Sequence, residues 1–158
     1  MGAKSEGLVT QFEAKAREAM ATLEQLSEAD WKKVTEAEKW SVGVTAHHLA
    51  GALEAVSGLV KKSAAGQPVT FRLDQLDEMN ARHAKEYAGC TKAETIALQK
   101  KGTAVAVATI RGLSDEQLAK SGTLGPGGPT MTAEQLITLG LLNHIDEHFG
   151  SIRKTAGL

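Results

Sequence analysis

The sequence predicts an all-α fold, a bundle of four long helices with one shorter helix between them. Three observations support this class. Apolar residues recur at three- and four-residue spacing, capping side chains precede most of these runs, and only 3 of the 158 residues are proline. No segment shows the sustained alternation that is typical of strands. The length suits a single domain with one core, which we expect to span residues 1–158.

The first long helix is predicted from about Leu8 to Leu26. Its apolar stripe consists of Phe12, Ala16, Ala19, Leu23 and Leu26. Ser27, with Asp30 three residues later, is typical of the cap of a short helical turn that runs through Trp31. The charged segment 32–39 is expected to be an irregular connection.

The second long helix is predicted from Val42 to about Lys62. Ser41 serves as its N-cap, and the segment 64–68, which contains glycine and proline, ends it. A shorter helix is expected over residues 73–87. We interpret the surrounding segment 71–88 as a long crossover connection between two helices of the bundle.

The remaining helices are predicted from their caps. Thr91-Lys92-Ala93-Glu94 has the pattern of a capping box and begins a third long helix that ends near Arg111. Residues 114–117 cap one more turn. The segment 122–129, with four glycines and two prolines, is predicted to be a loop, and the last long helix runs from near Thr132 to Thr155.

Composition excludes several classes of protein. A formal net charge of −1 offers no footprint for nucleic acid or an anionic membrane, so no nucleic-acid partner is expected. No apolar run is long enough to span a bilayer, so no membrane role is expected either. The single cysteine, Cys90, rules out an intramolecular disulfide framework and fits a reducing cytoplasm.

The histidines are the residues most suggestive of chemistry. His144 and His148 stand at i and i+4 on the margin of the apolar stripe of the last helix, where their imidazoles can converge on one divalent metal. At 100° per residue, His48 lies at the flank of the apolar stripe of the second long helix, and His47 lies about 160° from Leu49. We therefore expect His47 to be a surface residue.

A third ligand is geometrically available. Antiparallel packing of the second and last long helices would bring His48 level with His144 and His148. Three histidines would leave coordination positions open, as in catalytic metal centres. A histidine pair at this spacing also occurs by chance on amphipathic helices, and His144 is followed by Ile145, so this is not the H-E-x-x-H motif of metalloproteases.

These features together resemble the DinB-like superfamily, which includes YfiT-like proteins and the N-terminal domains of mycothiol-dependent maleylpyruvate isomerases. Three segments carry the resemblance, which spans about Leu8 to Thr155. They are Trp40-Ser41 followed by His48-Leu49, Leu76-Asp77-Glu78-Met79-Asn80, and the last-helix segment from His144 through His148 to Ile152-Arg153. The order and spacing of these segments match the family pattern.

The resemblance implies a bundle of up-down-down-up topology with a short crossover helix. It implies that His48, His144 and His148 bind a divalent metal, nickel or zinc. The chemistry it implies is S-transfer or isomerisation that uses a low-molecular-weight thiol, or a related hydrolysis. A homodimer is also plausible because family members often pair through helix faces. His47 has no role in the family pattern.

Several other residues are candidate participants in chemistry at this site. Glu147 is on the same side of its helix as His144 and could orient a ligand or act as a base, although a solvated charge is the commoner role. Cys90 is interpreted as a small, half-buried side chain. Arg72 and Arg82 could meet the carboxylates of an acidic thiol.

Three functions remain open from the sequence. The first is a metal-dependent thiol transferase or hydrolase acting on a small-molecule substrate. The second is a protein that binds a metal or an apolar ligand without turnover. The third is an interaction module in which the histidines are ordinary bundle residues.

Overall fold

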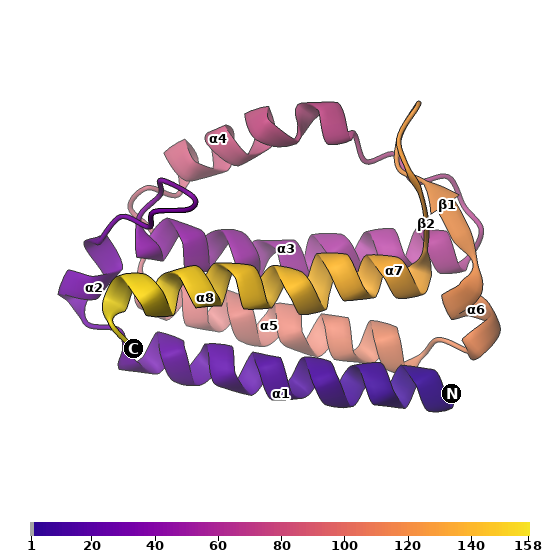
Figure 1. Cartoon of the computed structure of the whole chain (residues 1–158), viewed down its shortest axis with the longest axis horizontal. Helices are drawn as coiled ribbons and strands as arrows, with labels where there is room; N and C mark the ends of the chain where they lie inside the picture. Colours follow the sequence, from indigo (N-terminus) through magenta and orange to yellow (C-terminus); the bar gives the residue numbers. More distant parts are fainter. Residues whose placement is uncertain (1) are drawn as a thin grey trace.

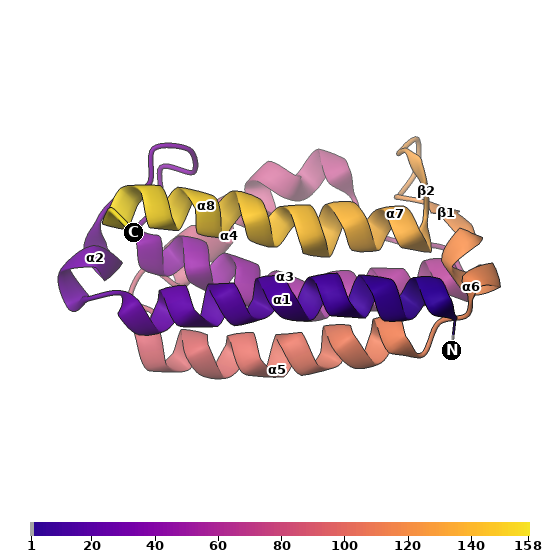
Figure 2. The same ribbon diagram turned by 60° about the horizontal axis from the view of Figure 1, so that its bottom comes forward.

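The computed structural model describes residues 2–158 as a bundle of four long helical arms (Figures 1 and 2). These arms are α1 (Ala3–Gln25), α3 (Val42–Ala64), α5 (Lys92–Arg111) and a last arm made of α7 (Ala133–Ile137), a π-helical segment (Thr138–Asn143) and α8 (His144–Ala156). Figure 1 shows that α1 and the last arm run in one direction and α3 and α5 in the other. The topology is therefore up-down-down-up, as the resemblance implied.

The crossover that this topology requires consists of a 3₁₀ turn (Leu73–Gln75) and helix α4 (Leu76–Glu86). It returns the chain from the end of α3 to the start of α5, so that these two arms run parallel (Figure 1). None of the residues in α4 is fully buried. The helix therefore lies on the outside of the bundle.

Side-chain caps begin α3 and α5 at the predicted places, whereas α1 begins at Ala3, five residues before its predicted start. The hydroxyl of Ser41 accepts a hydrogen bond from the backbone N–H of Val44 at 3.0 Å. Thr91 and Glu94 form the predicted capping box, in which each side chain accepts a hydrogen bond from the backbone N–H of the other residue. These bonds satisfy donors that a helix start would otherwise leave free.

The ends of the bundle are closed by short elements. At one end lies α2 (Glu28–Lys32), whose Trp31 donates from its indole N–H to the backbone carbonyl of Cys90 at 2.9 Å. At the other end lie α6 (Asp115–Ala119) and an antiparallel hairpin of β1 (Ser121–Thr123) and β2 (Thr130–Thr132). The segment predicted as a plain loop is therefore a hairpin, because its glycines and prolines fill the turn between two very short strands.

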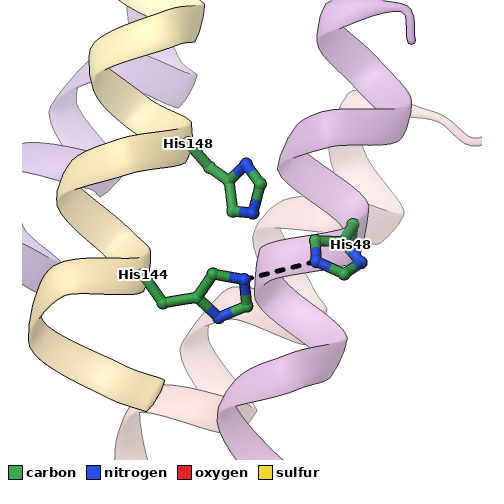
Figure 3. Close-up of side chains that lie close together, drawn as sticks. All are labelled: His48, His144 and His148. Atoms are coloured by element: carbon green, nitrogen blue, oxygen red, sulfur yellow. Dashed lines mark hydrogen bonds between the residues drawn. The ribbon is translucent and has the colours of Figure 1, made fainter. Parts of the chain in front are cut away.

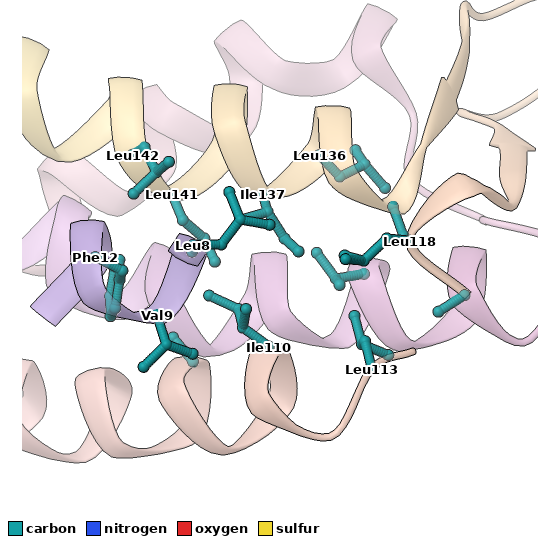
Figure 4. Close-up of a cluster of buried hydrophobic side chains, with 14 of the residues drawn as sticks. Leu8, Val9, Phe12, Ile110, Leu113, Leu118, Leu136, Ile137, Leu141 and Leu142 are labelled. Carbon is teal, nitrogen blue, oxygen red and sulfur yellow. The ribbon is translucent and has the colours of Figure 1, made fainter. Parts of the chain in front are cut away.

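Two buried clusters form the core. The larger fills the hairpin end and includes Leu8, Phe12, Ile110, Ile137 and Leu141, as Figure 4 shows. The second fills the end near α2 and combines Leu23, Leu26, Trp31, Val42, Leu49, Ile145, Phe149 and Ile152. The apolar stripes predicted for the first and last long helices are buried throughout. Within residues 2–158, no helix combines the length and apolar character needed to cross a membrane.

The last arm differs from the predicted uninterrupted α-helix. Residues 138–143 form a π-helical segment that ends where His144 begins α8. Gly140 lies in this segment against Val56 of α3, and an added Cβ there would meet Val56 Cγ1 at 2.7 Å. The wider π turn changes the rotation of α8 relative to α7, so it influences where His144 and His148 point.

Candidate metal centre

His48, His144 and His148 converge between α3 and α8. One ring nitrogen from each residue lies within 4.8 Å of those of the other two, and the three side chains are half-buried. Figure 3 shows His48 reaching from α3 toward the two histidines that stand one turn apart on α8. The Nε2 atoms of His48 and His144 are 3.3 Å apart. The antiparallel packing of the two helices thus brings the predicted residues level.

A carboxylate orients one of the three rings. Nδ1 of His148 lies 2.8 Å from Oε1 of Glu38, and the hydroxyl of Ser151 donates to Oε2 of the same carboxylate at 2.6 Å. Both partners of the His148–Glu38 contact are largely buried, with side-chain exposures of 13% and 10%. Because Nδ1 is engaged, Nε2 is the nitrogen of His148 that remains for a metal.

The connection between α2 and α3 supplies this carboxylate. The chain turns back on itself between Lys33 and Val42, whose N–H donates to the Lys33 carbonyl at 2.8 Å. Within this loop Lys39 adopts a left-handed conformation with φ 63°, which is uncommon for a residue other than glycine. The turn at Lys39 places Glu38 against His148 and Trp40 against His48. The ring centroids of Trp40 and His48 are 5.2 Å apart. Strain of this kind is found preferentially at functional sites.

Two of the histidines, His48 and His144, favour the neutral form that a metal requires. Burial, together with the positive charges that His148, His144 and His83 would carry, lowers the pKa of His48 to about 3. Burial and His148 lower the pKa of His144 to about 4. Burial alone would raise the pKa of Glu38, but the hydrogen bonds from Ser151, Thr35 and His148 leave it below its ordinary value. Unprotonated nitrogens beside an ionised carboxylate fit the donor set of a divalent zinc or nickel ion.

His47 is buried, which corrects the expectation that it lies on the surface. Its residue exposure is 8%, its Nδ1 lies 2.9 Å from Nε2 of His83, and its ring stacks on Tyr87 at a centroid distance of 4.1 Å. His83 and Tyr87 come from the crossover and its end. The angle of about 160° from Leu49 correctly places His47 away from the core of the bundle. That side of α3 is nevertheless covered, because α4 packs over it.

The other candidate residues lie outside the histidine centre. Glu147 is exposed, in agreement with a solvated charge. Arg72 pairs with Asp74 at 2.7 Å and Arg82 with Glu78 at 3.6 Å, in exposed ion pairs. Burial raises the pKa of the half-buried Cys90 thiol, which is the opposite of what activates a nucleophile.

A large cleft in the described part of the chain does not coincide with the histidines. It has a volume of about 800 Å³ and lies between the segment 66–72 and the hairpin. It contains no histidine, cysteine or carboxylate among its lining residues. The convergence of ligand nitrogens is therefore a better guide to chemistry here than cavity size.

Sequence reasoning missed Glu38 and Ser151. Glu38 stands in an irregular loop 110 residues away from its partner His148, where no periodicity predicts a contact. Ser151 stands three residues after His148, on the same helical face, and that spacing was the only signal for it.

The family model of the mycothiol maleylpyruvate isomerase N-terminal domain matches residues 12–142. Two solved structures of the mycothiol-dependent maleylpyruvate isomerase superpose with TM-scores of 0.77 and 0.74 at 13% and 14% identity, covering 94% of this chain. The chain spans 60% of the length of those proteins. No curated protein sequence matches it significantly.

Two further structures are similar over nearly their whole length. YfiT from Bacillus subtilis, described as a probable metal-dependent hydrolase with an unusual four-helix bundle topology, has a TM-score of 0.77 at 17% identity and 99% and 90% coverage of the two chains. The colibactin self-resistance protein ClbS, solved in complex with a dsDNA, has a TM-score of 0.72 at 17% identity, with 96% and 94% coverage. At these identities the likeness establishes the fold alone.

Proposed function

Because the chain belongs to the mycothiol maleylpyruvate isomerase N-terminal domain family, within the DinB-like superfamily, we propose that it is a divalent-metal-binding protein. The proposed ligands are His48, His144 and His148, the metal is nickel or zinc, and the activity is thiol S-transfer or a related hydrolysis. The observation that carries the proposal is the convergence of three ring nitrogens within 4.8 Å, with Glu38 fixing the ring of one of them.

The surrounding residues suit a reactive centre. Three histidine ligands leave coordination positions free for a substrate or water, whereas structural zinc sites use four protein ligands. A metal bound here would lower the pKa of a bound thiol or water and so supply a nucleophile near neutral pH. Glu38 holds the tautomer of His148, and Trp40 packs beside His48 and limits the motion of its ring.

The choice between the two chemistries rests on relatives. The maleylpyruvate isomerases are mycothiol-dependent, which favours a low-molecular-weight thiol as co-substrate. YfiT is described as a probable metal-dependent hydrolase, which favours water as the nucleophile. The alternative is a bundle that binds a metal or small ligand without turnover, or an interaction module without a metal.

We further propose a cytoplasmic protein that acts on a small-molecule substrate or thiol, with a homodimer as its expected assembly. The dsDNA complex belongs to ClbS. For this chain the net charge of −1 favours no nucleic-acid partner.

The test is metal stoichiometry, measured by elemental analysis and by titration of the metal-stripped protein with nickel and zinc. We expect about one metal per chain, lost in His48→Ala and in His144→Ala but retained in His47→Ala, whose imidazole contacts His83 and Tyr87. Circular dichroism verifies that each variant is folded. Failure of the wild type to bind metal, or binding indifferent to His48, would contradict the proposed centre.

A second measurement separates an enzyme from a binding protein. The metal-loaded protein is incubated with monochlorobimane and a panel of bacillithiol, mycothiol and glutathione. Faster conjugation than the uncatalysed reaction, abolished in His144→Ala, supports thiol transfer. Metal binding without turnover of any thiol favours hydrolysis or simple binding.

A further inference from the structure

All five histidines of the chain belong to one connected cluster. The ring of His83 lies with its centroid 5.6 Å from that of His48, in an edge-to-face arrangement, and His47 lies 5.1 Å from His83. The ring nitrogens of His47 and His83 are not among those that converge in the three-histidine centre. They form a second group directly beside it.

Only one of the two ring nitrogens of His83 has a hydrogen-bond partner within residues 2–158. Its Nε2 lies 2.9 Å from Nδ1 of His47, whereas its Nδ1 is buried without a hydrogen-bond partner within residues 2–158. Tyr87 contacts both rings, at centroid distances of 4.1 Å from His47 and 4.8 Å from His83. A neutral imidazole has one donor and one acceptor, so the oriented ring of His83 retains the capacity for one more bond.

The position of His83 suits a role at the metal. Behind His48 and His144, their sequence neighbours Leu49 and Ile145 are packed into the core with exposures of 0% and 1%. Any exchangeable ligand of a metal held by these histidines must therefore approach from the outer side of the bundle. Helix α4, which carries His83, crosses the outside of the bundle above α3 (Figure 1).

The charge of the centre favours an anionic ligand. The three converging side chains are imidazoles, which are neutral when they bind a metal, and the carboxylate of Glu38 is hydrogen-bonded to Nδ1 of His148. A divalent ion would keep its full charge there. A thiolate can supply negative charge and a metal bond together, and it accepts hydrogen bonds.

We propose that His83 is a positioning residue for a thiolate bound in an exchangeable position of the metal centre. Nδ1–H of His83 donates a hydrogen bond to the sulfur, while Nε2 of His83 accepts the N–H of His47. This inference rests on the proposed metal centre and its thiol chemistry, and it adds the residue that positions the thiol.

The test uses the protein loaded with Co²⁺, whose thiolate complexes have a charge-transfer absorption band, and 2-mercaptoethanol as the probe. We expect His83→Ala to bind one Co²⁺ as the wild type does but to bind the thiol about tenfold more weakly, the loss of one hydrogen bond to a charged group. His83→Gln, whose amide can donate, should recover part of this affinity. His47→Ala should produce a smaller loss, because the ring of His83 loses its partner.

Lys85→Ala is the matched control, since Lys85 is an exposed residue of the same helix. It should bind both the metal and the thiol normally. Equal thiol affinity in the wild type and His83→Ala, or no recovery in His83→Gln, overturns the role of His83 and leaves the metal centre intact. Loss of Co²⁺ from folded His83→Ala overturns it too, by making His83 a ligand. A wild type that binds no Co²⁺ overturns the metal centre itself.

Discussion

Among single residues, Glu38 decides how His148 is presented to a metal. Its carboxylate accepts from Nδ1 of His148 and from Ser151, so the ring has one orientation and one free nitrogen. We expect Glu38→Ala to weaken zinc affinity by about 10- to 100-fold, the usual effect of removing such an outer partner. Competition with a chromophoric chelator measures this affinity.

Glu36→Ala is the control for that prediction. Glu36 lies in the same loop, is exposed, and pairs with Lys154 at 3.0 Å. Its removal should leave zinc affinity unchanged. An unaltered affinity in Glu38→Ala would show that packing of the two helices alone orients His148.

The contacts of the histidines show why the positions of some residues could be predicted and those of others could not. The spacing of His144 and His148 is a local property of a helix, so the sequence predicted their convergence correctly. The burial of His47 depends on a crossover that returns 36 residues later with His83. A helical wheel, which considers one helix and one core, has no means of representing that contact.

At the scale of elements, the approach of α5 to α3 depends on Gly102. A Cβ at this position would lie 2.9 Å from Cβ of Leu53 and 3.0 Å from the carbonyl oxygen of Ala50. We expect Gly102→Ala to lower the free energy of unfolding by roughly 1–2 kcal/mol, because overpacking outweighs the better helix propensity of alanine. Urea denaturation of the metal-free protein measures the change.

Gly58→Ala provides the opposite case. Gly58 is exposed on α3, and an added Cβ there would meet nothing within 4 Å. Alanine should stabilise the protein by roughly 0.5–1 kcal/mol through helix propensity alone. If Gly102→Ala were also stabilising, the two helices would have to move apart without cost.

The last helical arm shows the limit of periodicity at this scale. The capping box at Thr132 and Gln135 and the buried positions along the arm follow the predicted pattern. The π-helical segment 138–143 was not predicted, because one wide turn barely disturbs the spacing of apolar residues.

For the whole molecule, the half-buried histidines His48 and His144 make stability depend on pH. Folding lowers the pKa of His48 to about 3 and of His144 to about 4, whereas both are near 6.5 in the unfolded chain. Below pH 6.5 the unfolded state binds more protons, so the metal-free protein should lose stability as the pH falls from about 7 to 5. Each histidine should contribute on the order of 1–2 kcal/mol to this loss.

Urea unfolding of the metal-free protein at pH 7, 6 and 5 measures the loss. The double variant His48→Gln/His144→Gln, which removes both titrating groups, should show a flatter dependence on pH. A wild type with equal stability at pH 7 and 5 would mean that these imidazoles become protonated without cost in the fold.

The sequence by itself determined the all-α class, the capped starts of the helices, the buried stripes and the helical faces that carry His48, His144 and His148. These properties arise from interactions within about four residues along the chain. Only the tertiary structure decided that Glu38 meets His148, that α4 buries His47 against His83, and that a π turn precedes His144. The two side-chain contacts join residues 110 and 36 positions apart, so they depend on how the completed helices and loops pack.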